Sequence, residues 1–586
     1  MTVPLPRPRT AALALVMSTA LVAPFGASLA SAAPGDDVTL TPLGTFSTGA
    51  FDEGASEIVA HDPQTQRAFV VNAQAGTVDV LDIADPSDPT KVGTLDTPGA
   101  NSVDVHDGLV VVAEQADTRT DAGTVSFFDA ETLTTERTVT VGSLPDMVTF
   151  TPDGRRVVVA NEGEPEGYCA GQVDPEGSIS VIDVSKGVAR AKVRTADFTS
   201  FNGRAKKLEA AGVRLFGPHA TVAQDLEPEY VATSADGRTA WVTLQEANSV
   251  AVVDLQAARV TKIVPLGLKD HSAEGQGIDA SDKDDAIAID SHPVKGMYMP
   301  DGAVAYSAGD GAEYVVTANE GDAREYDCFA EEERVKDLDL DPTAFPDAEA
   351  VQADESLGRL TVTTTSPRSD EGYTELHSFG GRSVSILGAD GSQVWDSGDA
   401  LEQLVAERDP EHFNSGHDDN DSFDSRSDAK GPEPEGLDIG TIGGSSYAFV
   451  GLERDSGLAV VDVTDPTGAE IVGYAKNRDF SGDPEAGTAG DLGPEGVHFI
   501  PAADSPTGEP LLLVGNEVSG TTTIWQVDAP GALPEPTQPT DPTDEPTDPT
   551  DEPTADSTDE PTSRPTDDGD DTDEPVRGPV VETDLL

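Results

Sequence analysis

The sequence predicts an all-β fold, a seven-bladed β-propeller followed by a disordered Pro/Thr/Asp/Glu-rich C-terminal tail. The prediction rests on an internal repeat of short β-rich runs and on the Asp-Gly turns that divide them. The clearest unit is LPDMVTFTPDGRRVVVANE at residues 144–162, followed by GSISVIDV at 177–184. A second copy, EPEYVATSADGRTAWVTLQEANSVAVVDL at 227–255, has the same turn and the same ending.

Weaker copies bring the number of units to about seven. Each unit supplies three strands, and a less regular run after it, such as 189–198, supplies the fourth, outer strand of a blade. We expect the N-terminal run at 38–46 to pair beside TTTIWQV and close the ring without a free edge. An α/β fold would need helical patterns between the strands, and only short ones occur, at 204–212 and 399–407. The weaker copies lie at 56–83, 101–130, 299–388, 432–463 and 494–527.

The first residues are typical of a secretory signal. Arg7 and Arg9 precede an apolar run that ends on Ala-Ser-Ala at 30–32, a small-x-small cleavage pattern. A membrane anchor is the alternative, but Pro24 and Gly26 interrupt the run, and no later segment is apolar for long enough to span a bilayer. We therefore expect a signal peptide at 1–32, the propeller at 33–530 and a disordered acidic stalk at 531–586.

The charge balance sets limits on the partners. With 36 basic and 109 acidic residues, the 586-residue chain has a formal net charge of −73. A protein that grips nucleic acid needs clustered Lys and Arg, so we exclude that class. The expected partner is an unidentified cell-wall or extracellular ligand, and the expected state is a secreted or wall-associated monomer. The tail ends RGPVVETDLL, without an LPxTG-type sorting motif, so both release and noncovalent retention stay open.

Two acidic positions recur in the repeat, one just before the first strand and one just after the second. In an antiparallel hairpin the start of one strand lies beside the end of its partner, so each pair should meet at the open end of a hairpin. All blades point the same way around the axis, which predicts a gathering of carboxylates around the mouth of the central channel. The pairs are Asp146 with Glu162, Glu229 with Glu246, Asp301 with Glu320, Glu435 with Glu453 and Glu495 with Glu517.

Two acid-rich insertions, 277–290 and 412–436, should emerge on the same face. Ca²⁺ prefers several oxygen ligands on a flexible loop, so these acids are candidates for a calcium site, although the spacing is not that of an EF-hand. The alternative is that they pair with Arg382, Arg426 and Arg454 or face water. The candidate metal ligands are Asp279, Asp282, Asp284, Asp418, Asp419, Asp421, Asp424, Glu229, Glu246, Glu435 and Glu495.

The two cysteines occupy matched positions, Cys169 after Asn-Glu-Gly at 161–163 and Cys328 after Asn-Glu-Gly at 319–321. Both belong to loops predicted on one face, and an exported chain meets an oxidising compartment. We expect a Cys169–Cys328 disulfide, although its loops would have to bridge the blade between them.

Several longer strings resemble a known family. NEGEPEG, DASDKDDAI, YVVTANEGDAREY, FNSGHDDNDSFDSRSDAKGPEPEG and DLGPEGVHFI are similar to the choice-of-anchor I domain of exported bacterial proteins, over about residues 40–528. That domain is itself similar to mesenchyme-specific cell-surface glycoproteins linked to biomineralisation, and its shorter repeats resemble YVTN-type propellers. The resemblance implies a seven-bladed propeller on a surface protein. Members are often labelled alkaline phosphatase, without an agreed activity.

These observations favour an exported binding or adhesion module that binds a divalent cation. The alternative is a metal-dependent hydrolase, most plausibly an alkaline-phosphatase-like phosphoesterase. A phosphoryl-transfer site needs a nucleophile or bridged metals and a cationic group. The nine His residues form no HExxH motif and no dense cluster, and there is no GxSxG elbow. Only His412 and His417 lie close together in sequence, beside an acidic run. The residues to mutate first for catalysis are Glu229, Glu246, Glu435, Glu495, His417 and Asp418.

Overall fold

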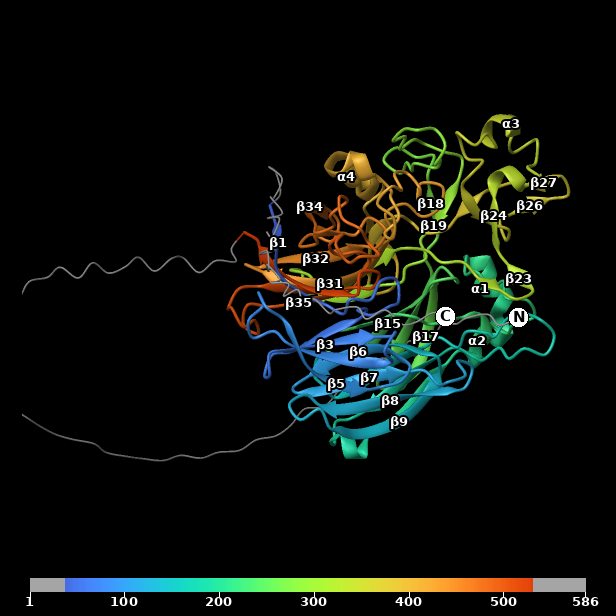
Figure 1. The fold of residues 1–586 in the computed structure, drawn as a ribbon. Coiled ribbons are helices and arrows are strands. Elements are labelled where there is room, and N and C mark those ends of the chain that lie inside the picture. Colours follow the sequence, from blue (N-terminus) through green and yellow to red (C-terminus); the bar gives the residue numbers. More distant parts are fainter. Residues whose placement is uncertain (1–36, 531–586) are drawn as a thin grey trace, which may run out of the picture. The chain divides into compact units, whose positions relative to one another are not determined.

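In the computed structural model the described residues, 37–530, form seven four-stranded antiparallel sheets, as the repeat predicts (Figure 1). Each sheet is one blade, and its inner strand contacts the inner strands of the two neighbouring blades. The contacts run from β2 through β6, β10, β14, β20, β31 and β35 and return to β2, so the ring is closed. The prediction of a β-propeller is confirmed.

The strands of the first four blades follow one another along the chain. Blade 1 contains β2 (Val59–Asp62), β3 (Arg67–Asn72), β4 (Thr77–Asp82) and β5 (Thr90–Asp96); blade 2 contains β6 (Ala100–His106), β7 (Leu109–Glu114), β8 (Ala122–Asp129) and β9 (Thr135–Ser143); blade 3 contains β10 (Pro145–Phe150), β11 (Arg156–Asn161), β12 (Ser178–Asp183) and β13 (Lys192–Asp197); blade 4 contains β14 (Val231–Thr233), β15 (Thr239–Leu244), β16 (Ser249–Asp254) and β17 (Arg259–Pro265).

The last three blades include the long insertion and the ring closure. Blade 5 contains β20 (Ala303–Ser307), β21 (Glu313–Asn319), β29 (Ser383–Gly388) and β30 (Gln393–Asp396); blade 6 contains β31 (Pro434–Ile442), β32 (Ser445–Leu452), β33 (Gly457–Asp462) and β34 (Glu470–Lys476); blade 7 contains β35 (Pro494–Ile500), β36 (Leu511–Asn516), β37 (Thr521–Asp528) and β1 (Thr39–Ser47). The predicted closing strand is therefore present, with Thr39 opposite Asp528 and Ser47 opposite Thr521. In Figure 1 the blue β1 lies among the orange strands of the last blades.

The core lies between the blades. Second strands such as β11 are buried on both faces, which is why they read as apolar runs without alternation. The cluster between blades 3 and 4, for example, brings Val158 and Ile179 together with Val242 and Ala251, all fully buried. Each blade is thus held by the two sheets that flank it.

The insertions contain more regular structure than the sequence reading assigned to them. A five-stranded sheet, in the order β18 (Leu268–Asp270), β19 (Lys295–Met297), β28 (His377–Ser378), β25 (Thr361–Thr363), β24 (Glu332–Arg334), is separate from the blades. Two short hairpins accompany it, β22 (Glu325–Tyr326) with β23 (Phe329–Ala330) and β26 (Arg368–Ser369) with β27 (Gly372–Tyr373). The α-helices are α1 (Ala205–Ala211), α2 (Val222–Asp225), α3 (Ala348–Val351) and α4 (Ala400–Arg408), and the 3₁₀-helices are Val188–Arg190, Thr199–Arg204, Val335–Asp337 and Pro410–His412.

The chain divides into two units, residues 1–534 and 535–586. The predicted signal peptide and the predicted stalk lie outside the described residues. Within residues 37–530, no helix has both the length and the apolarity needed to cross a bilayer.

Ring closure by β1 gives a first prediction. Deleting residues 37–47 removes the buried side chains of Val38 and Leu40 and leaves β37 as an open edge. At about 1.5–3 kcal/mol for each buried apolar side chain, we expect the free energy of unfolding to fall by about 3–6 kcal/mol. Denaturant unfolding measures this loss, and light scattering measures edge-to-edge association. The control Val92→Ala, at an exposed site, should change little. If the deletion variant has the same free energy of unfolding as the intact chain, β1 does not stabilise the closed ring.

Candidate metal centre

Six carboxylates and one amide mark the start of the seven inner strands. In four blades this position lies on a β-bulge or register shift, between Ala100 and Ser102, Pro145 and Val148, Pro434 and Leu437, and Pro494 and Val497. The extra residue interrupts the ladder and re-aims the side chain at that point. The seven equivalent residues, from blade 1 to blade 7, are Glu57, Asn101, Asp146, Glu229, Asp301, Glu435 and Glu495.

Glycine lets these positions approach one another in the second half of the ring. A Cβ on Gly436 would lie 1.6 Å from the backbone oxygen of Glu495, and one on Gly496 would lie 2.4 Å from that of Glu57. Gly302 stands in the same relation to Glu435, at 2.3 Å. Real Cβ atoms do not come that close. The glycine of each Pro-acid-Gly triplet in blades 5, 6 and 7 therefore allows the backbone of the neighbouring blade's acidic residue to pack against it.

The second recurring acid position brings further carboxylates to the same place. Glu162, Glu320, Glu453 and Glu517 each follow directly after the second strand of their blade. In blade 4 that register position is Gln245, and Glu246 lies one residue later. The paired arrangement expected from the repeat is therefore present, with a one-residue offset in blade 4.

The two sets meet at the channel mouth in four groups whose ligand atoms lie within 4.8 Å of one another. All of these groups, as found in residues 37–530, are built from the recurring acids together with His417 and Glu433. They are Glu162, Glu229 and Glu246; Asp301, Glu320 and Glu435; Glu320, Glu433 and Glu453; and His417, Glu453 and Glu517.

One side of the mouth is neutralised by the protein itself. The buried carboxylate of Glu433 accepts Lys430 Nζ at 3.1 Å, Arg454 Nε at 3.2 Å and Arg426 Nε at 3.0 Å. Burial opposes its ionisation, but these three cations hold the pKa of Glu433 well below its usual range. Lys430 also contacts Glu320 at 2.6 Å. This half of the ring carries built-in counter-charges.

The group of Glu162, Glu229 and Glu246 has no such partner, and we call it the proposed metal centre. Among the described residues none of its carboxylates forms an ion pair with Lys, Arg or His. Glu229 is 8% exposed and Glu246 is 4% exposed, and each has a buried Oε2 without a hydrogen-bond donor. Oxygens in that state are expensive to leave unsatisfied. Three convergent carboxylates are a donor set for a hard divalent cation.

Burial raises the pKa of most of the mouth carboxyls, and neighbouring carboxylates add to the shift. The pKa of Glu229 is raised well above the usual value, first by burial and then by Glu246. Burial raises the pKa of Glu246 to about 7. Burial is also the largest cause of the raised pKa of Glu162, which lies well above its usual range. Burial also raises the pKa of Glu57, Asp146 and Glu320 to about 7 and that of Glu517 to about 8. The pKa values of Asp301, Glu435 and Glu495 are raised well above the usual range for the same reason.

The aspartates of the two insertions lie apart from these groups. Asp282 pairs with Arg359 at 2.9 Å, an arginine outside the three expected partners, and Asp284 accepts the Ala286 amide. Asp279 is buried and accepts two backbone amides, and burial raises its pKa to about 6. Within residues 37–530, no three acids of these loops offer ligand atoms as close together as those at the mouth.

The acidic run from Asp418 divides into exposed and buried members. Asp418, Asp419 and Asp421 are exposed, whereas Asp424 is buried. Asp424 accepts the Ser427 hydroxyl on Oδ1, its Oδ2 has no donor, and burial raises its pKa to about 7. Metal binding by the loop acids therefore stays a prediction.

The sequence reading missed several residues of the site. Glu57 was overlooked because blade 1 begins Ser-Glu-Ile and lacks the Pro-acid signal of blades 3 to 7. Glu433 and Lys430 were overlooked because they lie in an insertion, outside the repeat. His417, which was singled out for its acidic neighbours, instead contacts Glu453 at 3.1 Å and Arg454.

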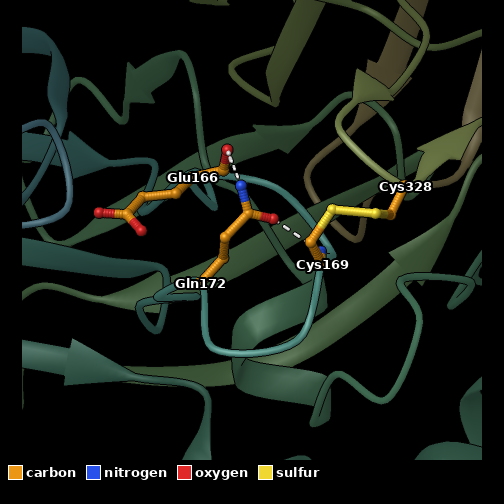
Figure 2. Close-up of a disulfide and its surroundings, with 4 residues drawn as sticks. All are labelled: Glu166, Cys169, Gln172 and Cys328. Carbon is orange, nitrogen blue, oxygen red and sulfur yellow. Dashed lines mark hydrogen bonds between the residues drawn. A yellow bond between two sulfur atoms is a disulfide. The ribbon is translucent and has the colours of Figure 1, made fainter.

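The structure contains the Cys169–Cys328 disulfide, with 5.3 Å between the Cα atoms (Figure 2). Its two loops follow Glu162 and Glu320, on either side of blade 4. Figure 2 shows Gln172 bonded to the Cys169 amide and to the backbone oxygen of Glu166, which fixes the turn that carries Cys169. A disulfide fits an oxidising compartment.

Residues 57–466 match the choice-of-anchor I domain family. The chain belongs to the choice-of-anchor I family. Two curated relatives support this assignment. Gigasin-3a of Magallana gigas is 34% identical over 194 residues, 30% of this chain and 67% of that protein. The mesenchyme-specific cell surface glycoprotein of Strongylocentrotus purpuratus is 32% identical over 288 residues, 42% of this chain and 36% of that protein. The match thus spans about a third of the glycoprotein's length.

Solved structures similar to this choice-of-anchor I protein are distant in sequence. Hydrazine synthase of Kuenenia stuttgartiensis is 14% identical with a TM-score of 0.42, covering 82% of this chain and 97% of that chain. The WD40 domain of Toxoplasma gondii coronin is 10% identical with a TM-score of 0.42, covering 86% of this chain and 89% of that chain. Neither likeness says anything about activity.

The buried carboxyls give a prediction for pH. A carboxyl with a raised pKa in the folded chain binds more protons folded than unfolded between the two pKa values, so the free energy of unfolding falls as pH rises through that window. With pKa values of about 7 for Glu57, Asp146, Glu246 and Glu320, the window runs from the usual value of 4.5 or below to about 7. We expect chelator-treated choice-of-anchor I protein to melt at a lower temperature at pH 8 than at pH 5. A melting temperature that rises over this range without metal would contradict the buried-acid description.

Proposed function

We propose that this chain is an exported surface protein whose propeller binds a divalent cation, calcium in particular, at the channel mouth and acts as a binding or adhesion module. The observation that carries the proposal is the proposed metal centre, in which three carboxylates have ligand atoms within 4.8 Å of one another and form no ion pair with a Lys, Arg or His of the described residues. Homology to a cell surface glycoprotein supports display outside the cell.

The donor set favours a hard cation over a transition metal. The centre is made of carboxylate oxygens alone, and calcium takes six to eight oxygens at about 2.3–2.6 Å in flexible geometry. Zinc sites are usually completed by Cys or His nitrogen and sulfur ligands, and this group contains none. Both Cys residues are joined in the disulfide.

A bound cation has a clear physical role at this place. It would supply the positive charge that Lys430, Arg426 and Arg454 supply to Glu433 on the other side of the mouth. With that charge present, the carboxylates can ionise at neutral pH without mutual repulsion. The mouth then offers an ordered, strongly acidic surface for an extracellular ligand, in keeping with the net charge of −73.

Calcium binding should depend on the centre. We expect the metal-free protein to gain thermal stability when calcium is added at pH 8, because the cation binds the folded chain and not the unfolded one. The double variant E229Q/E246Q keeps the shape of both side chains but removes two charges. We expect its calcium affinity to fall by about 100-fold or more, because the loss of an outer-shell partner alone costs about 10–100-fold. Isothermal titration calorimetry measures the affinity, and differential scanning calorimetry measures the melting shift.

The matched control replaces the exposed loop acids, in the triple variant D418N/D419N/D421N. It removes three charges near the same face but leaves the centre intact, so calcium affinity should change by less than about threefold, which reflects long-range charge alone. Loss of binding in this variant, together with normal binding by E229Q/E246Q, would move the site to the 412–436 loop.

One observation favours the hydrolase alternative. His417, Glu453 and Glu517 form a group of nitrogen and oxygen donors that could bind a metal ion. Arg454 contacts both His417 and Glu453, so a cationic side chain lies beside these potential ligands. A metal-dependent phosphoesterase needs both. Phosphomonoester and phosphodiester turnover that is lost on chelation and in His417→Ala would establish an enzyme. A stabilising metal without turnover supports the binding module.

A further inference from the structure

We infer that two loops joined by the Cys169–Cys328 disulfide form a cap that retains the cation in the proposed metal centre. The cap consists of residues 163–176, which follow Glu162, and residues 321–335, which follow Glu320. This inference rests on the proposed cation site and adds the element that controls entry and exit. The two loops leave blades 3 and 5, so their junction crosses blade 4, which contributes Glu229 and Glu246.

Every ligand of the centre lies at or near an anchor of the cap. Two residues after Glu162, the carboxylate of Glu164 accepts the Tyr326 hydroxyl at 2.7 Å and pairs with Arg119. Tyr326 belongs to the other loop of the cap. A change in the position of this loop is therefore transmitted to Glu162 through one short stretch of backbone.

The second anchor lies two residues before Glu229. Arg324, from the cap, is buried and pairs with Asp225 and with Glu227, the latter at 2.9 Å. Glu227 is also buried, and its other oxygen has no donor. A buried guanidinium held by two carboxylates is costly to separate, because either partner left alone would be an uncompensated charge. The cap is thus fixed to the segment that leads into Glu229.

The third anchor holds Glu246. Arg214 donates to the Glu246 backbone oxygen at 2.7 Å and pairs with Glu331 of the cap. Glu331 in turn accepts the Arg324 amide at 3.1 Å, which ties the second and third anchors together. All three ligands are consequently positioned by the same covalently closed unit.

Aromatic packing fills the junction between the two loops. Tyr168 meets Tyr326 and Phe329 edge to face, with ring centroids 5.7 and 5.5 Å apart, and its backbone amide donates to the backbone oxygen of Asp327 at 2.9 Å. Phe216 receives both Arg324 and Arg214 on its face. The low exposure of Glu229 and Glu246, at the open end of a channel, agrees with a cover of this kind.

A cover that excludes solvent slows both association and dissociation of a bound ion, whereas a loss of ligands changes mainly the equilibrium affinity. We therefore expect the double variant C169S/C328S of the full secreted chain to release calcium at least about tenfold faster and to bind it faster as well, as for a lid that opens more often. The dissociation constant should change less than about threefold. Stopped-flow mixing with a fluorescent chelator measures release, and calorimetry measures the affinity.

Two further variants separate the cap from a general loss of structure. Tyr326→Phe removes the bond to Glu164 but keeps the disulfide and the ring packing, so release should accelerate by a smaller factor. Val92→Ser, at a half-exposed site in blade 1 and outside the cap, should leave both rates unchanged. Circular dichroism establishes that each variant is folded.

The outcomes are distinguishable. If the wild-type chain binds no calcium, the proposed cation site is wrong and the inference falls with it. If the wild type binds calcium and C169S/C328S releases it at the wild-type rate, the cation site stands and the cap is wrong. If the double variant loses affinity in proportion to its faster release, the disulfide shapes the ligands rather than gating them, which also overturns the inference.

Discussion

The mutual repulsion of buried carboxylates at the channel mouth is the constraint on which the rest of this structure depends. Closing seven blades into a ring brings the starts of seven inner strands together, and six of those starts carry an acid. Like charges in a region of low dielectric either take up protons or acquire counter-ions. The protein uses its own cations around Glu433, whereas Glu162, Glu229 and Glu246 form no ion pair with Lys, Arg or His within residues 37–530.

This asymmetry connects the fold to the proposed function. Identical loops would give the repeated positions of the ring identical environments. The insertions within blades 3 and 5 and between blades 5 and 6 make the sectors different. One insertion contributes Lys430 and Arg426 to Glu433, and the others form the disulfide-joined cap. Propeller blades supply a rigid scaffold, and the loops on it determine the chemistry, as expected when function is carried by sites added to a common fold.

Much of the fold was predictable from the sequence because each blade repeats the same strand and turn signals. The closing strand β1 was predictable because a propeller otherwise leaves an edge, and the disulfide because the two cysteines follow matched Asn-Glu-Gly segments. The five-stranded insertion sheet was not, because strands of two or three residues such as β28 carry no readable periodicity. The recurring acids predicted the cluster of carboxylates at the channel mouth. The partners of the loop acids could not be predicted, because Asp282 pairs with Arg359, which lies 77 residues away in the sequence.

The most direct test of this account is the location of the cation itself, by anomalous diffraction from crystals of the full secreted chain grown with calcium or with a lanthanide substitute. The account predicts an anomalous peak bounded by carboxylate oxygens of Glu162, Glu229 and Glu246 beneath the disulfide-joined loops. A peak confined to the 277–290 or 412–436 loops, or an empty channel mouth at saturating calcium, would contradict it.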